Sequence, residues 1–256
     1  FLSQFIEWGG YAMADFRIEK LKDMLEDSRY TVAVCGSGMM TENGFMGIKT
    51  PEKAYAVEEK YGASPEEIFT SSYYNTRTRQ FFEFYREEIL ADLTPSASAF
   101  AMAAMEKAGK LQCIISSNIY EFSQRGGCSN VINLHGSIYQ NQCPHCKKMY
   151  SMEYIKNSKS VVPLCENCGH VIRPLVSLFG EMVDSQKMTS TTEEIEKADM
   201  LILLGTHLDS EVFGTYIRYF EGRYLAVIHK DEKYADEKAD LVIHDEPKNI
   251  LPLLGY

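Results

Sequence analysis

The sequence lacks any apolar run that approaches the roughly 20 residues of a membrane-spanning helix. It also lacks a basic leader, since Phe1 to Phe16 contains Glu7 and Asp15, and we expect no signal peptide. Basic residues are in the minority, with 26 Lys and Arg against 36 Asp and Glu and a formal net charge of -10. This balance disfavours nucleic acid and anionic membranes as partners. We therefore expect a soluble protein.

The cysteines do not suit a disulfide framework, because there are seven of them and four lie in two CxxC pairs. In a chain of 256 residues this pattern favours metal ligation in a reducing compartment, which predicts a cytoplasmic location. The length suits one large α/β domain with a small insertion, or two modest domains.

Short apolar runs that end in Gly, Ser, Asn or His indicate buried parallel strands. There are six of them: Thr31–Cys35, Leu111–Ile115, Val131–Leu134, Met200–Leu204, Leu225–Ile228 and Leu241–Ile243. Helical patterns lie between several of them, at Ile18–Leu25, Ala97–Ala108 and Thr192–Lys197. The alternation predicts an α/β fold with a doubly wound parallel sheet.

Ligands of such sheets bind at the carboxyl ends of the strands. That rule gives one candidate rim, made of Gly36–Gly44, Ser116–Tyr120, His135–Ser137, Gly205–Leu208 and His229.

Two stretches interrupt the alternation. Residues 45–92 form a predicted helical module, and the aromatic residues between Tyr73 and Leu90 are expected to be core rather than a nucleotide-stacking surface. Residues 138–173 carry four cysteines and form the second module. Residues 1–44, 93–137 and 174–256 are left for the sheet domain.

Those four cysteines have the spacing of a zinc ribbon, C-x2-C-x18-C-x2-C, with Cys143, Cys146, Cys165 and Cys168 as ligands. Each CxxC turn places two sulfurs on one side of a tight loop, and two turns complete a tetrahedron. A site of four thiolates leaves no open position for water, so one structural zinc ion is predicted. His145 and His170 lie beside ligands and could replace one. Cys35, Cys113 and Cys128 are expected to be ordinary buried thiols.

A glycine-rich turn, Gly36-Ser37-Gly38, follows the first strand, and its backbone amides could approach a pyrophosphate. Thr41 stands where the dinucleotide fingerprint has its third glycine. The turn alone therefore also fits a plain strand-to-helix connection.

Five segments together resemble the sirtuins, the NAD-dependent protein lysine deacylases. Gly36 to Gly44 is similar to the family's GAGxSxxSG loop, and Ser116 to Ile119 to its TQNI segment. Further matches are Leu134-His135-Gly136-Ser137 (LHGS), Leu178 to Met182 after Arg173-Pro174 (RPxVVxFGExL), and Gly205 to Leu208 (GTSL). They occur in family order around the four-cysteine ribbon, and the resemblance spans about Phe16 to Leu254.

The resemblance implies a Rossmann-like NAD-binding domain and a small lobe of helical module and zinc ribbon, with NAD and an acyl-lysine protein or peptide in the cleft between them. In such enzymes nicotinamide leaves as the acyl oxygen attacks the ribose, and a histidine then takes a proton from a ribose hydroxyl. His135 holds that position, and an imidazole with a pKa near ~6.5 can act as a base at neutral pH.

By the same carry-over, Asn118 is the other catalytic residue and contacts the nicotinamide ribose. Cofactor contacts are further expected from Gly36, Ser37, Gly38, Tyr120, Gly205, Thr206, His207 and His229. Phe179, Gly180 and Glu181 are expected to form an edge that pairs with the substrate peptide as an added strand.

Several residues depart from the family pattern. Phe45 to Lys49 replaces the family's Ile-Pro-Asp-Phe-Arg, and a lysine lacks the planar fork of the lost arginine. Tyr120 replaces the aspartate that grips the nicotinamide carboxamide, His207 replaces a serine, and His229 replaces an asparagine near the adenosine ribose.

These departures leave four hypotheses. The first is an NAD-dependent lysine deacylase with a remodelled pocket. The second is a sirtuin-like ADP-ribosyltransferase or NAD hydrolase, and the third is an impaired module that binds NAD or ADP-ribose without turnover. A zinc-ribbon scaffold with no nucleotide is the fourth.

Overall fold

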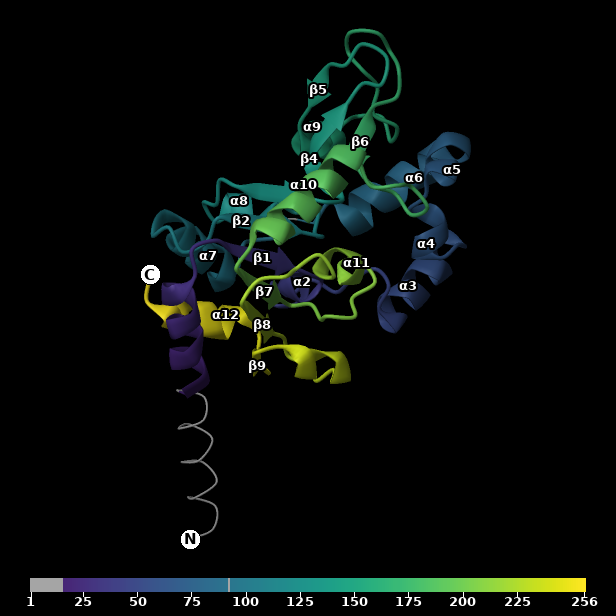
Figure 1. Ribbon diagram of the computed structural model, residues 1–256. Helices are drawn as coiled ribbons and strands as arrows, with labels where there is room; N and C mark the ends of the chain where they lie inside the picture. The colour runs from purple at the N-terminus through teal and green to yellow at the C-terminus, as the bar shows by residue number, and fades with distance from the viewer. Residues whose placement is uncertain (1–15, 92) are drawn as a thin grey trace.

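Six parallel strands form the central sheet of the computed structural model, which describes residues 16–91 and 93–256 (Figure 1). Their order is β3-β2-β1-β7-β8-β9. The bounds are Thr31–Cys35 (β1), Cys113–Ser116 (β2), Val131–Asn133 (β3), Met200–Leu204 (β7), Tyr224–Ile228 (β8) and Leu241–Ile243 (β9). All six predicted strands are confirmed, with ends that differ by at most two residues. The expectation about a leader falls on residues 1–15, which lie outside the described part of the chain.

Helices cover both faces of this sheet, as a doubly wound fold requires. On one face, residues 16–27 pack with α7 (Ala97–Lys107), α12 (Pro247–Ile250) and η3 (Leu251–Leu254) against the side chains of Ala33, Ile202 and their neighbours. On the other face, α10 (Ser185–Lys197) and α11 (Gly214–Ile217) pack against Val32, Val34 and Leu203. Because side chains of a strand alternate between faces, each strand contributes to both cores. The predicted fold class is confirmed.

The strand order reverses between β1 and β7. From β1 the chain moves outward through β2 and β3, and it returns to the other side of β1 as β7. Cys35 at the end of β1 is in register with Ser116 of β2 and Leu204 of β7. The three loops that follow these strands therefore leave the sheet at one edge, next to the switch point where ligands bind in such folds.

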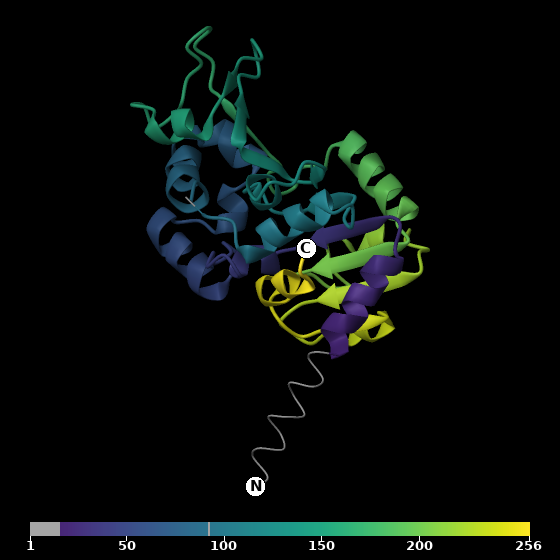
Figure 2. The same ribbon diagram turned by 90° about the vertical axis from the view of Figure 1, so that its left-hand side faces the viewer.

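The helical module and the ribbon lie side by side in the small lobe (Figure 2), and their side chains form one hydrophobic core. The module contains α3 (Pro51–Tyr61), α4 (Pro65–Ile68), α5 (Ser71–Thr76), α6 (Thr78–Phe84) and the π-helix η1 (Tyr85–Ile89). The ribbon contains an antiparallel sheet in the order β5-β4-β6, from Met149–Tyr150, Gly136–Gln142 and Arg173–Val176, with α9 (Met152–Asn157). Phe81, Phe82 and Tyr85 are fully buried in this core, which confirms that the aromatic residues are core.

Some details differ from the sequence prediction. The helix expected at Thr192–Lys197 begins two turns earlier, where Asp184 accepts hydrogen bonds from Gln186 N–H and Lys187 N–H as an N-cap. Its first half is polar, so hydrophobic periodicity gave no signal there. The ribbon sheet includes Gly136 and Val176, which pair with each other across the expected boundaries after 137 and before 174. The division into domains stays a prediction.

Two further observations concern the whole described chain. Within residues 16–91 and 93–256 no helix is both long and apolar enough to cross a membrane. Cys35, Cys113 and Cys128 are buried thiols, as expected.

Candidate active site and metal centre

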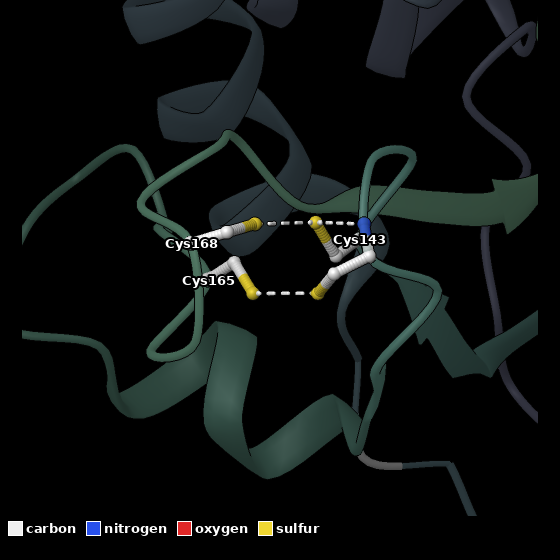
Figure 3. A group of neighbouring side chains, drawn as sticks. Cys143, Cys165 and Cys168 are labelled. Carbon is white, nitrogen blue, oxygen red and sulfur yellow. Dashed lines mark hydrogen bonds between the residues drawn. The ribbon is translucent and has the colours of Figure 1, made fainter.

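The four cysteines of the ribbon converge (Figure 3). Their sulfur atoms all lie within 4.8 Å of one another. Cys143 Sγ is 3.4 Å from Cys168 Sγ, and Cys146 Sγ is 3.5 Å from Cys165 Sγ. A tetrahedron of thiolates at about 2.3 Å from zinc has sulfurs about 3.8 Å apart, so this set fits one zinc ion after a small expansion.

The surroundings suit thiolate ligands. Cys143 and Cys165 are buried, and the Tyr150 hydroxyl donates to Cys165 Sγ at 3.1 Å. Burial raises the pKa of Cys165, but hydrogen bonds from Tyr150 and from the Asn167 and Cys168 amides outweigh it and lower the pKa to about 6. His145 and His170 stack on each other at 4.2 Å and are exposed, next to the ribbon. The geometry brings all four predicted ligands together.

The two glycine loops at the switch point pack back to back. Gly38 N–H donates to Gly205 O and Gly36 N–H to Leu204 O, each at 2.9 Å. A Cβ at Gly36 would lie 2.4 Å from Thr206 Cβ, and one at Gly38 would lie 2.6 Å from Gly205 Cα. Such approaches are possible only for glycine. The predicted phosphate amides of Gly36 and Gly38 are therefore engaged with protein carbonyls, and Ser37 is the residue of this turn left for a ligand.

Asn118 is buried after β2 and held by its neighbours. Its Nδ2 donates to Ser116 Oγ at 2.6 Å, and its Oδ1 accepts from Tyr120 N–H at 2.9 Å. These two bonds fix which way the amide group faces, while the amide keeps one N–H and one lone pair for another partner.

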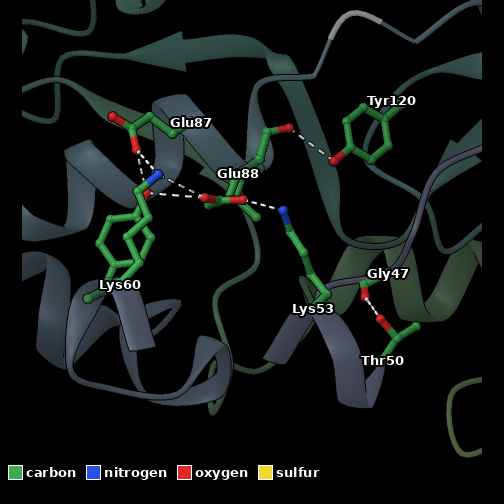
Figure 4. Close-up of polar contacts among 9 residues, drawn as sticks. Gly47, Thr50, Lys53, Lys60, Glu87, Glu88 and Tyr120 are labelled. Atoms are coloured by element: carbon green, nitrogen blue, oxygen red, sulfur yellow. Dashed lines mark hydrogen bonds and ion pairs between the residues drawn. The ribbon is translucent and has the colours of Figure 1, made fainter. Parts of the chain in front are cut away.

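The side chain of Tyr120 turns away from the sheet edge into the core of the small lobe. It is 2% exposed, and its hydroxyl donates to Ile89 O at 3.0 Å (Figure 4). Its ring contacts Phe45 and Phe122, with centroids 5.2 and 5.7 Å away. Burial raises the pKa of its phenol. Tyr120 thus joins the Asn118 segment to the π-helix and to the loop after Gly44.

The π-helix is in turn tied to α3 by charged groups (Figure 4). Glu88 pairs with Lys53, and Lys60 Nζ lies 2.7 Å from Glu87 Oε2. Helix α3 follows directly on the loop that contains Lys49, whose ammonium lies 4.5 Å from the centre of the Phe179 ring. The lysine that replaces the family's arginine therefore contacts the expected peptide-binding segment as a cation over an aromatic face.

His135 lies between the two sheets, directly before Gly136 of β4. Its side chain is half-buried, and its own carbonyl accepts from Ser177 N–H at 2.9 Å. Burial, and secondly the positive charge of Lys187, lower the pKa of its imidazole. In the described part of the chain no protein group hydrogen-bonds the ring. A neutral imidazole with a free nitrogen is what a general base requires.

The segment Phe179 to Glu181 lies across from the helical module. Phe179 N–H donates to Phe69 O at 2.8 Å, and Phe179 forms a parallel bridge with Thr70. The Glu181 carboxylate binds Arg173 Nη2 at 2.8 Å and Leu178 N–H at 2.8 Å. The Glu181 carboxylate therefore stabilises the turn, and Gly180 adopts the positive φ of 81° that the turn requires.

His207 and His229 follow β7 and β8 and lie against each other, with ring centroids 3.7 Å apart. His207 Nδ1 is 2.8 Å from Asp236 Oδ2. Thr206 is buried, beside the glycine loop. All the residues predicted for the cofactor except Tyr120 thus lie at the carboxyl edge of the sheet.

No role for the carboxylates of Asp236 and Glu42 was predicted from the sequence. Asp236 lies in a run of charged residues, which is typical of a solvated loop, yet it is 2% exposed. Glu42 is buried behind the glycine turn, where it accepts from the Ser96 and Ser98 hydroxyls and from Lys248 N–H at 2.9 Å. Neither role had a local signal, because each depends on residues distant in the chain.

Comparison with known proteins places these features in a family. A model of the Sir2 family matches residues 36–211. NAD-dependent protein deacetylases of Clostridium acetobutylicum and Cutibacterium acnes are 34% and 35% identical to this chain over 236 and 228 residues. These matches cover 92% and 89% of this chain, and 96% and 93% of the relatives.

Solved structures agree with the sequence matches. A structure on the basis of sirtuin substrate affinity has a TM-score of 0.84 at 26% identity, and it covers 92% of this chain and 97% of its own. A Sir2 structure with a p53 peptide and NAD+ has a TM-score of 0.78 at 25% identity, with 93% and 96% covered. The fold and the sequence similarity to the deacetylases along most of the chain lead to one conclusion. This chain is a member of the Sir2 family, the sirtuins.

Proposed function

We propose that the protein is an NAD-dependent protein lysine deacylase, which transfers the acyl group of a modified lysine to ADP-ribose and releases nicotinamide. The observation that carries the proposal is His135, a half-buried imidazole without a protein partner in the described chain, at the same sheet edge as the oriented amide of Asn118. The deacetylase names of the relatives, and the acetylated peptide bound to a related Sir2 structure, support it.

The groups left free at the sheet edge suit a dinucleotide. Five residues keep donors or acceptors that have no protein hydrogen-bond partner in the described chain, and they follow strands β1, β2, β3, β7 and β8 in turn: Ser37, Asn118, His135, His207 and His229. Such a row can bind phosphates and ribose hydroxyls on both sides of the switch point. NAD supplies the electrophilic ribose carbon and the leaving nicotinamide.

His135 accepts a proton in this scheme. Its lowered pKa keeps the ring neutral at physiological pH, so a ribose hydroxyl can transfer its proton to the free ring nitrogen. Asn118 holds the ribose in place, because Ser116 and the Tyr120 amide fix the direction of its side chain. The remaining amide proton of Asn118 is the donor available for the ribose.

The peptide lies along Phe179 to Glu181. Phe179 N–H is already used by Phe69, so the pairing falls to the main chain of Gly180, in the manner of an added strand. Phe179 and Lys49 line the entry for the acylated side chain. The amide of an acyl-lysine is neutral, so the positive charge of Lys49 does not repel it. The zinc ribbon stabilises the lobe that presents this segment and takes no part in the chemistry.

Purified protein incubated with NAD and with acetyl-, propionyl- or longer acyl-lysine peptides tests the proposal. Nicotinamide and deacylated peptide are expected in equal amounts. His135→Asn abolishes both, while His244→Asn, at the end of β9, leaves both in place. If none of the acyl peptides leads to release of nicotinamide, the protein is not a deacylase.

A second candidate, an ADP-ribosyltransferase or NAD hydrolase, is favoured by the direction of Tyr120. The family's carboxamide-binding acid is absent here, and its replacement is buried in the small lobe. Consumption of NAD without any acyl peptide selects this candidate. Binding of NAD without turnover selects an impaired binding module. For either activity we place the protein in the cytoplasm, where the ribbon thiols stay reduced.

A further inference from the structure

Two histidines lie beside the four cysteines of the ribbon. His145 is in the first CxxC turn and His170 follows the second, so the two come from different loops. Their rings stack with centroids 4.2 Å apart and planes within 2° of parallel, and both side chains are exposed. One ligand atom of each histidine and the sulfur of Cys168 all lie within 4.8 Å of one another. The three residues form a compact set of two nitrogens and one sulfur.

The backbone of the second CxxC turn holds His170 in this place. Gly169 has a positive φ of 73°, which lets the chain fold back after Cys168. Gly169 N–H donates to Cys165 O, and Cys165 N–H donates to His170 O, each at 2.8 Å. The position of His170 is therefore set by the same turn that positions two of the zinc ligands.

A hydrogen bond also decides which nitrogen of His170 is available. Its Nδ1 lies 3.2 Å from the carbonyl oxygen of Cys168. A carbonyl only accepts hydrogen bonds, so Nδ1 carries the hydrogen and Nε2 bears the lone pair. Histidines that bind metals commonly donate their other N–H to a backbone carbonyl in this way. In the described part of the chain the ring of His145 has no protein hydrogen-bond partner, so either of its nitrogens can bind a ligand.

The sulfur of Cys168 is able to serve two ions. Cys143 and Cys165 are buried, whereas Cys168, next to the histidines, is only half-buried. A thiolate that binds one metal ion keeps lone pairs with which it can bridge to a second. Four thiolates around one Zn²⁺ also leave an excess of negative charge, which attracts a further cation.

The donor set determines the kind of ion. Imidazole and thiolate are ligands of Zn²⁺, whereas Mg²⁺ and Ca²⁺ prefer oxygen. With Zn–N of about 2.0 Å and Zn–S of about 2.3 Å, the ligand atoms of a tetrahedral site lie roughly 3.3 to 3.6 Å apart. The atoms here lie within 4.8 Å, and small tilts of the two exposed rings close the difference. Exposed side chains make such movements freely.

We propose that His145, His170 and Cys168 form a second zinc site on the ribbon, which shares the sulfur of Cys168 with the structural ion. Three protein ligands leave a fourth position for water. This site is therefore open, and its ion exchanges with free zinc, unlike the ion in the closed four-cysteine site. The histidines thus add a site rather than replace a cysteine, and the inference does not depend on the proposed use of NAD.

Titration of the whole, dialysed chain with Zn²⁺, followed by native mass spectrometry, counts the ions. We expect one ion to survive dialysis and a second to bind on titration. His145→Asn and His170→Asn should each weaken the second ion at least about tenfold, because even the loss of an outer-shell partner costs a metal site about 10- to 100-fold in affinity. The first ion and the melting temperature should stay unchanged in both. His244→Asn, which replaces another exposed histidine after β9, is the matched control and should keep both ions.

Cobalt gives a readout that needs no variant. Co²⁺ added to the zinc-loaded protein should bind with the first zinc ion still present by mass, and it should produce a sulfur-to-metal charge-transfer band from Cys168. A single ion even in excess zinc overturns the inference, as does a second ion whose affinity is unchanged in both histidine variants. Co²⁺ that binds without the charge-transfer band also overturns it, since Cys168 would then not be a ligand.

Discussion

Replacement of Tyr120 by phenylalanine tests whether this residue belongs to the small lobe rather than to the nicotinamide pocket. The phenol donates to Ile89 O at 3.0 Å, and the ring packs between Phe45 and Phe122. Phenylalanine keeps the ring contacts and removes only the hydroxyl. The expected effect is a loss of folding stability, with little direct effect on the binding of nicotinamide.

The magnitude follows from what Ile89 O retains. This carbonyl also accepts from Ala91 N–H at 2.8 Å, so the variant leaves no buried acceptor without a partner. The cost is then that of one net hydrogen bond, about 0.5 to 1.5 kcal/mol, rather than a full desolvation penalty. For a chain of this size, 1 kcal/mol lowers the melting temperature by roughly 2 to 4 °C.

Tyr120→Asp restores the family's residue, so sequence comparison alone suggests that it improves nicotinamide binding. The structure instead predicts that it destabilises the protein. It removes a buried aromatic side chain, at a cost of about 3 to 5 kcal/mol, and places a carboxylate in an apolar core. Since domains have only about 5 to 15 kcal/mol of stability, the small lobe of this variant is expected to be largely unfolded.

Urea unfolding and nicotinamide inhibition, measured on both variants, decide the matter. We expect Tyr120→Phe to shift the urea midpoint and to leave the inhibition constant within about twofold, a difference of roughly 0.4 kcal/mol. A phenylalanine variant with unchanged stability and inhibition weakened more than tenfold would mean that the phenol faces the nicotinamide, and our assignment would be wrong.

The remaining predictions concern the metal and the base. The protein should contain one zinc ion, and chelation or Cys165→Ser should lower the melting temperature and the activity together. Cys113→Ser is the control and should keep the metal. Acceleration of the reaction by added zinc would contradict a closed thiolate site. Lys187→Gln removes a positive charge that lowers the pKa of His135, so that pKa rises, and because the base must be neutral the acidic limb of the pH–rate profile moves to higher pH. Lys197→Gln, at the other end of α10, should leave the limb in place.

Much of the fold could be predicted from the sequence because its signals are local. Buried parallel strands are continuous apolar runs, and β1, β7 and β9 end where the runs end. The zinc ligands were predicted from spacing alone, since two CxxC turns impose their own geometry. The alternation also predicted a doubly wound sheet with one rim of loops, whereas the strand order and the contact between the glycine loops came only from the structure.

The direction of side chains could not be predicted in the same way. Tyr120 occupies a family position at the sheet edge, but its larger ring is buried more favourably among Phe45 and Phe122 than beside a polar ligand. Asp236 and Glu42 are buried by contacts with His207, Ser96 and Lys248, which lie far from them in the chain. Such pairings depend on tertiary structure, so composition and periodicity contain no trace of them.

The π-helix η1 has a consequence for insertions and deletions. A π turn holds one residue more than an α turn, and each residue of a helix advances its phase by about 100°. Removal of one residue between Tyr85 and Ile89 would convert the turn to α-helix and rotate the Ile89 carbonyl away from the Tyr120 hydroxyl, although every side chain at the sheet edge stayed the same. The hydrogen bond between Tyr120 and Ile89 therefore depends on the number of residues in the π-helix as well as on the phenol hydroxyl.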